Sequence, residues 1–271
     1  MLEFPPFTDI HCHLAPSIDD GAKSWEETLA MARIAVDEGI GTIICTPHQC
    51  GNFGHNTADN IRALVARVQS RLDAATIPLC VLPGADVRIE PHLVGMLRRG
   101  DVLSLADRGR HVLLELPHEV YLPLEKLLDE LRAARLVGIL SHPERNEAIL
   151  ARPTLLPSLV AAGCLLQVTA GSLLGAFGPR AQQAAESFVQ QGLVHFIGTD
   201  AHGPKSRRPL MRQAFERCLR LVGQDAARCM FSANPAAVAA GREVQAGRVR
   251  VSSRSKARTA IADWFGRKQT A

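Results

Sequence analysis

The sequence predicts an α/β protein whose strands close into a distorted (β/α)7 barrel. Three observations support this fold class. Short apolar segments alternate with amphipathic ones along the chain, histidines and acidic residues recur where the apolar segments end, and a length of 271 residues suits one such barrel.

Seven short runs rich in Val, Ile and Leu are the expected strands. They cover residues 7–14, 42–47, 80–87, 111–117, 137–143, 164–170 and 194–200. Helical periodicity between them predicts helices at 24–38, 57–75, 121–136, 151–162 and 179–191, with a shorter connection near 90–99. Because helices that join consecutive strands make those strands parallel, all the carboxyl ends should meet at one rim of the barrel.

The helix expected at 24–38 has the clearest boundary signals. Ser24 and Glu27 match the S-x-x-E pattern of a capping box, and Gly39 stands where a helix-terminating glycine belongs. The apolar face of this helix is expected to consist of Trp25, Leu29, Ala32 and Val36.

Charge divides the chain into a barrel, residues 1–241, and a basic tail, residues 242–271. The net charge is +4, and the tail holds eight Lys or Arg against two acidic residues, so the barrel is near neutral. A near-neutral body argues against a nucleic-acid-binding protein. For the tail, two interpretations stay open. It is either an amphipathic helix in peripheral contact with an anionic membrane or an acidic partner, or a disordered segment, which its composition slightly favours.

The seven cysteines predict a reduced, cytoplasmic protein. They are odd in number, lie mostly inside apolar runs and form no C-x-x-C pair. None precedes an arginine by six positions, which excludes the Cys-x5-Arg phosphate loop of thiol-dependent phosphatases. We expect neither a secretory signal nor a membrane-spanning helix, since no apolar run is long enough.

Nine histidine and acidic side chains are expected at the one rim. In the first strand, alternation should point Asp9, His11 and His13 one way and Ile10, Cys12 and Leu14 the other. Of these, His11 and His13 belong to the nine, and Asp20 in the first loop is the third. The ends of later strands supply the other six: His48, Asp86, Glu115, His142, Asp200 and His202.

A metal centre explains this gathering better than packing does. A single histidine at a strand end is usually a hydrogen-bonded residue, but crowded carboxylates repel one another unless cations neutralise them. Nitrogen and oxygen ligands without a thiolate suit Mn, Fe or Zn. Nine ligands are too many for one ion and suit two or three.

The motifs at these positions resemble the polymerase and histidinol phosphatase (PHP) superfamily. They are DIHCHL, IDDGAKSWEE, TPH, GAD, LEL, SHPERN, QVTAGSLLGAFG and GTDAH. Within that superfamily, residues 9–240 are similar to the bacterial metal-dependent protein-tyrosine phosphatases of capsule and exopolysaccharide operons. The resemblance implies a TIM-like (β/α)7 barrel with a trinuclear centre, for which Mn²⁺ is favoured over Fe or Zn. It also implies a phosphotyrosine protein as substrate, typically the tail of a tyrosine kinase that controls polysaccharide export.

Transferred position by position, the resemblance implies three ion sites. The first ion would be held by His11, His13 and Asp200, and Asp86 would bridge it to a second ion completed by Glu115 and His142. The third ion would be held by Asp20, His48 and His202. The family usually has Glu where this chain has Asp86. Because aspartate is one methylene shorter, the bridge requires a closer backbone or is weaker.

The expected reaction is phosphoester hydrolysis, since metal coordination lowers the pKa of water towards about 7. Arg145 in SHPERN and Arg207 after TDAH are the candidates for gripping phosphoryl oxygens, because the guanidinium fork matches phosphate geometry. Phenolate, with a pKa of about 10, leaves without a dedicated acid. A proton could come from His48 or from a water molecule.

Three further polar residues have two interpretations each. Gln167 and Thr169 alternate on the sixth strand, and they either line the rim or make strand-end hydrogen bonds. Asp9 either orients a ligand histidine or pairs within the barrel.

Three alternatives stand beside the tyrosine phosphatase. Another PHP phosphatase would act on a small molecule, such as histidinol phosphate or a nucleotide, with the same barrel and metals. A barrel amidohydrolase is disfavoured because none of the expected strands contains the lysine that those enzymes usually need. A metal-binding regulatory protein without turnover has Asp86 as its one supporting feature.

Overall fold

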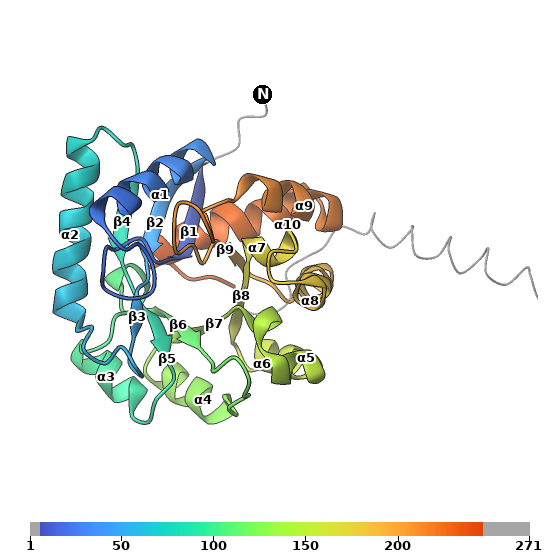
Figure 1. Cartoon of the computed structure of the whole chain (residues 1–271). Helices are drawn as coiled ribbons and strands as arrows, with labels where there is room; N and C mark the ends of the chain where they lie inside the picture. Colours follow the sequence, from blue (N-terminus) through green and yellow to red (C-terminus); the bar gives the residue numbers. More distant parts are fainter. Residues whose placement is uncertain (1–5, 246–271) are drawn as a thin grey trace, which may run out of the picture.

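The computed structural model describes residues 6–245 and confirms the (β/α)7 barrel (Figure 1). All seven predicted strands are present, two of them split in two. They are β1 (Phe7–Cys12), β2 (Ile40–Cys45) with β3 (His48–Gln49), β4 (Cys80–Pro83) with β5 (Asp86–Arg88), β6 (His111–Glu115), β7 (Val137–Ser141), β8 (Leu165–Thr169) and β9 (Phe196–Gly198). The interpretations of the basic tail concern residues that lie almost entirely outside the described range.

Helices surround the strands on the outside (Figure 1). They are α1 (Trp25–Asp37), α2 (Ala58–Ala74), α3 (Leu93–Arg99), α4 (Glu125–Ala133), α5 (Glu147–Ala151), α6 (Leu155–Ala161), α7 (Ala170–Leu173) and α8 (Pro179–Gln190). The helix predicted at 151–162 begins only at Leu155, after Pro153, whose ring prevents a helical residue before it. No helix within residues 6–245 combines the length and the apolar character needed to cross a membrane.

The strands are parallel throughout. One sheet has the order β1-β2-β4 and the other β3-β5-β6-β7-β8-β9. A parallel bridge between Cys12 and Ala201 brings the end of β1 beside the segment that follows β9, which closes the ring. The breaks after Cys45 and Pro83 transfer the ends of two strands to the other sheet. As a result, His48 and Asp86 become direct partners in register.

A β-bulge in β1 changes where the first histidines point. Asp9 pairs with Ile43 and Cys12 with Cys45, so β1 has one residue more than β2 between these pairs. Ile10 packs in the inner apolar cluster, whereas Cys12 packs in the outer one. The strict alternation predicted for residues 9–14, with Ile10 and Cys12 on one face, is therefore wrong, because the bulge inserts a half-period.

Asp9 holds this bulge in place. Its fully buried carboxylate accepts hydrogen bonds from the backbone N–H groups of His11 (3.1 Å) and Thr199 (3.0 Å) and from the Thr199 hydroxyl. Burial raises the pKa of Asp9 to about 6, although the hydrogen bonds oppose this rise. Of the two interpretations of Asp9, pairing within the barrel is the one that the structure supports.

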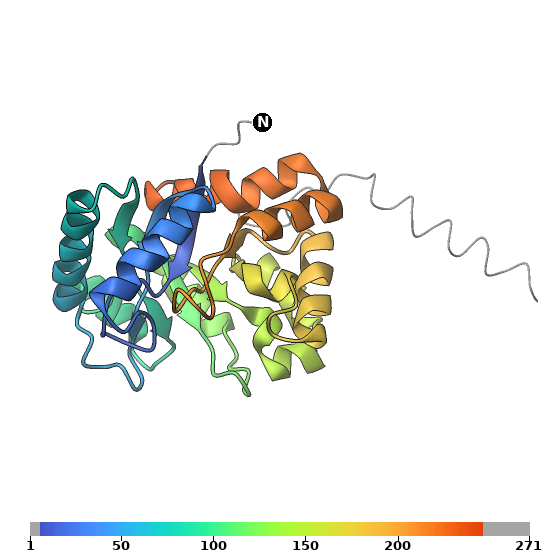
Figure 2. The ribbon, with the colours of Figure 1, turned by 45° about the horizontal axis from the view of Figure 1, so that its top comes forward.

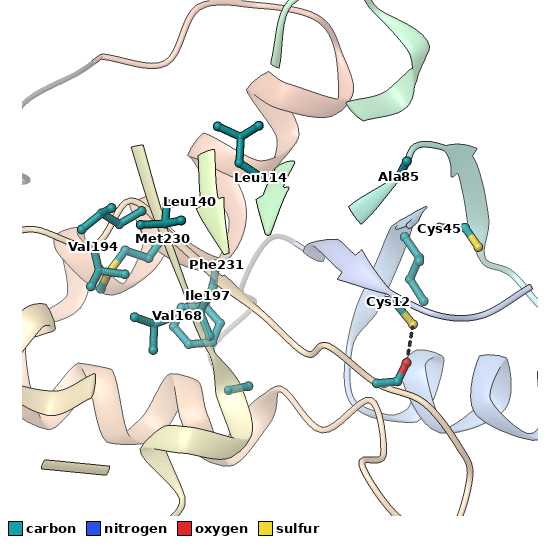
Figure 3. Close-up of a cluster of buried hydrophobic side chains, with 14 of the residues drawn as sticks. Cys12, Cys45, Ala85, Leu114, Leu140, Val168, Val194, Ile197, Met230 and Phe231 are labelled. Carbon is teal, nitrogen blue, oxygen red and sulfur yellow. Dashed lines mark hydrogen bonds between the residues drawn. The ribbon is translucent and has the colours of Figure 1, made fainter. Parts of the chain in front are cut away.

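Two layers of apolar side chains fill the molecule. The inner layer, inside the barrel, includes Ile10, Ile44, Leu113, Ile139, Leu165 and Phe196. The outer layer lies between the strands and the helices, and Figure 3 shows part of it, including Leu114, Leu140, Val168 and Ile197. Because apolar residues fill the inner layer, the polar residues that face inward are confined mainly to the carboxyl ends of the strands.

The boundary signals of α1 are confirmed with one shift. The Ser24 hydroxyl accepts a hydrogen bond from the Glu27 N–H (3.3 Å), and Gly39 has a φ of +88°. The Glu27 carboxylate accepts from the N–H of Lys23 (2.9 Å), one residue before the expected partner. Of the predicted apolar face, Ala32 is buried, and the other members pack partly buried against the core: Trp25, Leu29 and Val36.

Helices after residue 191 were not predicted. They are α9 (Arg212–Val222), α10 (Gln224–Arg228), the π-helical turn η3 (Cys229–Ala233) and α11 (Asn234–Ala239), drawn in orange and red beside β1 (Figure 2). Phe215 and Phe231 pack on Phe7, with ring centroids 5.1 and 5.7 Å away. Val238 joins the inner apolar cluster. This segment therefore belongs to the barrel and covers one end of its interior.

His111, at the start of β6, is a buried histidine far from the strand ends. Within residues 6–245 neither of its ring nitrogens has a hydrogen-bond partner. Burial, followed by the charge of Arg110, lowers the pKa of His111 to about 4. The unfolded chain then binds this proton more readily than the folded protein, so stability should fall as the pH drops from about 6.5 towards 4.

We expect His111→Leu to reduce this pH dependence. Between pH 7 and pH 5 the free energy of unfolding of the wild type should fall by about 2 kcal/mol more than that of the variant. Urea unfolding at both pH values measures the difference, with His55→Leu, at an exposed position, as control. An equal fall in wild type and His111→Leu would contradict the expectation.

Candidate metal centre

The nine predicted ligands all lie at the carboxyl ends of the strands and meet at one site. Four overlapping groups each bring one ligand atom per residue within 4.8 Å of the others. The groups are His13, Asp20, His48 and His202; His11, His142 and Asp200; His11, His13 and Asp86; and His48, Asp86 and Glu115. Since the groups share members, the structure contains one connected cluster.

His11 and His13 are held through Nδ1, which leaves both Nε2 atoms directed at the cluster. Oε1 of Gln167 lies 2.8 Å from Nδ1 of His11, and Oδ2 of Asp19 lies 2.7 Å from Nδ1 of His13. Because these oxygens only accept, Nδ1 carries the proton in both rings. The two Nε2 atoms are 3.3 Å apart, so one cation can be bound by both. Of the two interpretations of Gln167, the structure therefore supports the one in which it lines the rim.

The surroundings of the Asp86 carboxylate show whether a metal ion fits this site. It is fully buried, and among the described residues neither oxygen has a hydrogen-bond partner. Its Oδ2 lies 3.4 Å from Nε2 of His11 and 3.5 Å from Nδ1 of His48. Burial opposes its ionisation, yet His11 and then His48 keep the pKa of Asp86 below its usual value. A buried, ionised carboxylate without a hydrogen-bond donor fits a bound cation.

Asp20, His48 and His202 form the side of the cluster that faces solvent. Oδ1 of Asp20 lies 3.3 Å from Nε2 of His202 and 3.5 Å from Nε2 of His48. The Asp20 side chain is 55% exposed, whereas those of His11, His13 and Asp86 are inaccessible. Among these side chains, the cluster is therefore open to solvent on the Asp20 side.

Asp19 holds the loop in place, and the sequence analysis missed it. Its buried carboxylate accepts hydrogen bonds from Nδ1–H of His13, from the N–H of His48 (3.0 Å) and from the N–H of Gly21 (2.9 Å). A Cβ at Gly21 would lie 2.4 Å from the carbonyl oxygen of His13, so this position requires glycine. The sequence signal for this role was the Asp-Asp pair itself. Adjacent side chains in a tight loop point in different directions, so that Asp20 faces the cluster while Asp19 binds the loop.

Burial and neighbouring charges shift the pKa values of Glu115 and His142, the two members of the cluster that follow from β6 and β7, in opposite directions. Burial, and then the charge of Asp86, raise the pKa of Glu115 to about 8. Burial, and then Arg145, lower the pKa of His142 well below its usual value. His142 is therefore neutral, as a metal ligand must be, and Glu115 ionises at neutral pH only beside added positive charge.

Both predicted arginines reach the cluster through Asp200. Nη2 of Arg207 lies 2.6 Å from Oδ2 of Asp200, and Nη1 of Arg145 donates to the same oxygen. Oδ1 of Asp200 faces Nε2 of His11 at 3.2 Å. The Arg145 guanidinium also lies over the Phe177 ring, 4.3 Å from its centroid. That Arg145 and Arg207 bind phosphoryl oxygens stays a prediction. Both lie beside the predicted ligands, which is the position that such binding requires.

Three residues of the site have left-handed backbone conformations. His142 has a φ of +32°, Asp200 of +50° and Arg207 of +46°. Such angles are costly for residues with a Cβ and persist only where the surroundings impose them. Here they direct the side chains of His142 and Asp200 towards the cluster.

Glu144 is a second residue that the sequence analysis missed. Its fully buried Oε1 accepts hydrogen bonds from the N–H of Thr169 (3.0 Å) and the hydroxyl of Ser172 (2.6 Å). These bonds tie the turn with His142 and Arg145 to the start of α7. Thr169 thereby makes a strand-end hydrogen bond through its backbone, the second of its two interpretations. A glutamate between His142 and Arg145 in SHPERN was the available signal.

Comparison with known proteins identifies the family of the chain. The model of the family described as capsular polysaccharide synthesis, CpsB/CapC, matches residues 7–240. The tyrosine-protein phosphatase YwqE of Bacillus subtilis (strain 168) is 38% identical over 201 residues, which are 73% of this chain and 78% of YwqE. The tyrosine-protein phosphatase CpsB of Streptococcus pneumoniae is 25% identical over 233 residues, 84% of this chain and 96% of CpsB.

A solved structure is similar over nearly the whole described fold. It is a chain from the crystal structures of YwqE from Bacillus subtilis and CpsB from Streptococcus pneumoniae, described as unique metal-dependent tyrosine phosphatases. It superposes with a TM-score of 0.85 at 32% sequence identity and covers 91% of this chain and 100% of that chain.

We expect Asp19→Asn to weaken metal binding about 10- to 100-fold, because the amide cannot hold His13 and the loop with a full negative charge. Calorimetric titration of the metal-free protein with Mn²⁺ measures the affinity. Asp129→Asn, an exposed acid on α4, is the matched control and should bind as the wild type does. Wild-type affinity in Asp19→Asn would show that Asp19 does not support the ligands.

Proposed function

Because the chain belongs to the CpsB/CapC family of capsular polysaccharide synthesis, we propose that it is a metal-dependent protein-tyrosine phosphatase. The similarity to YwqE and CpsB supports the reaction class. The observation that carries the proposal in this chain itself is the connected cluster of nine ligands with two arginines on Asp200.

The proposed cofactor is two or three Mn²⁺ ions, with Fe or Zn as alternatives. Imidazole nitrogens and carboxylate oxygens suit these metals. The ligand groups by distance agree with the implied set for Asp20, His48 and His202. For His142 the distances favour a place with His11 and Asp200 rather than with Glu115, and we propose that assignment.

The residues of the chain have separate tasks in this proposal. When bound, the ions supply Lewis-acid activation of a water molecule and of the phosphoryl group. Arg145 and Arg207 grip phosphoryl oxygens, since both guanidinium groups already meet at one carboxylate oxygen. The proton for the leaving oxygen comes from a water molecule or, in place of its role as a ligand, from His48, whose side chain is 17% exposed at the solvent side. The contribution of this proton is small, because a phenolate with a pKa of about 10 is a fair leaving group.

The proposed substrate is phosphotyrosine in a protein, first of all the tail of a bacterial tyrosine kinase that regulates capsular or exopolysaccharide synthesis. The family description supports the link to capsular polysaccharide synthesis. Peripheral contact of the basic residues of 242–271 with an anionic membrane is the alternative to a disordered tail in this proposal.

The purified protein with Mn²⁺ should release phosphate from a phosphotyrosine peptide, and a chelator should abolish the release. His11→Ala should lower the rate at least about 100-fold, because it removes a shared ligand. A malachite-green phosphate assay with histidinol phosphate as the comparison substrate measures both. Release from histidinol phosphate alone would instead identify a small-molecule phosphatase with the same metal centre.

Arg207→Ala should lower kcat/KM for the peptide about 100- to 1,000-fold, because one guanidinium contact with the transferring group is lost. Arg208→Ala is the matched control: Arg208 is adjacent but exposed, and the rate should stay within about twofold of wild type. The metal content of both variants is measured, since Arg207 also contacts Asp200. Equal losses in the two variants would refute the assignment to Arg207.

A further inference from the structure

We propose that a groove beside the metal centre binds the aromatic ring of the substrate and that Phe53 in its wall is the residue that determines the preference for an aryl over an alkyl group. This inference rests on the proposed phosphatase function and names the residues that would recognise the organic part of its substrate. The groove has a volume of about 260 Å³, and its walls include His48, Phe53, Arg88, Glu115 and His118.

The groove opens directly onto the ligand cluster. His48 and Glu115 belong to both, and each contacts Asp86 or lies in one ligand group with it. The walls come from the ends of β3, β5 and β6, which are neighbours in one sheet. A group bonded to a phosphoryl oxygen in the cluster therefore enters this groove without crossing a further element.

Phe53 supplies an aromatic face that is held in position. Its ring stacks on His48, with centroids 5.1 Å apart and planes at 24°. The turn that bears it is closed by a hydrogen bond from the Phe53 N–H to the Cys50 carbonyl (2.9 Å), and Gly51 donates its N–H to the Glu90 carboxylate (2.7 Å). Because these hydrogen bonds already fix the turn, binding of a ligand ring costs little conformational entropy in Phe53.

Two further flat groups line the groove. The Arg88 guanidinium lies 3.2 Å from Oε2 of Glu115 and donates to the Leu116 carbonyl (3.3 Å), with 38% of its side chain exposed. The His118 ring, on the loop after β6, lies 5.6 Å from the His142 ring. Planar cations and aromatic rings stack favourably on an aryl group, and an alkyl chain offers no such face.

The two arginines on Asp200 determine the orientation. Asp200 groups with His11 and His142, whereas the groove borders the group of His48, Asp86 and Glu115. A phosphoryl group held by Arg145 and Arg207 thus directs its ester oxygen towards the groove. In an aryl phosphate a single oxygen separates phosphorus from the ring, so the ring must lie immediately beside the cluster, where Phe53 stands.

The test compares phenylphosphonate with methylphosphonate, which bind without being hydrolysed, by calorimetry on the Mn²⁺-loaded full chain. Wild type should prefer phenylphosphonate. Phe53→Leu should reduce this preference about two- to tenfold while Mn²⁺ affinity stays unchanged, and Phe53→Tyr should keep it. Val120→Ala is the matched control, because Val120 is an exposed apolar residue of the rim outside the groove.

Each other outcome counts against the inference. Equal binding of the two phosphonates by wild type, or no binding of either, would overturn it. Equal weakening of both by Phe53→Leu, or weaker Mn²⁺ binding, would show that Phe53 acts only through His48. The proposed function is tested separately: an aryl preference without peptide hydrolysis refutes the phosphatase and leaves the groove, while hydrolysis without the preference refutes the groove.

Discussion

The repulsion among carboxylates at one buried rim is the constraint on which this structure depends. Asp86, Asp200 and Glu115 lie within or beside groups of ligand atoms less than 4.8 Å across, and their side chains are largely or wholly buried. Such crowding is unfavourable without positive charge. Imidazoles, two arginines and the proposed metal ions provide it, and they have to be placed to within a fraction of an ångström.

The irregular features of the fold serve this placement. The bulge in β1, closed by Asp9, turns His11 towards the interior, and the breaks in the second and third strands bring His48 beside Asp86. Three site residues accept left-handed backbone angles. Because the regular strands and outer helices bury a continuous apolar core, the barrel can sustain this local strain.

The polar residues behind the ligands divide the site into two halves. On one side, Asp200 binds the two arginines and Glu144 holds the turn that bears Arg145. On the other, Asp19 holds His13 and the backbone of His48, which is a wall of the groove. A phosphate monoester has the same two parts, a charged group and an organic group. The division therefore matches the shape of the proposed substrate, and binding energy from each half acts on the bond between them.

The sequence by itself determined the seven strands, the five predicted helices up to residue 191 without the short α5 and α7, and the nine polar side chains that meet at the rim. Apolar periodicity and strand-end position are local properties, and parallel strands place all their ends together. Only the tertiary structure decided the bulge in β1, the split strands, the roles of Asp19 and Glu144, and the helices that begin with α9. These depend on partners far along the chain: Asp9 meets Thr199, and Phe7 meets Phe215. Local pattern cannot report such contacts, because hydrogen-bond satisfaction and packing are settled only when distant segments come together.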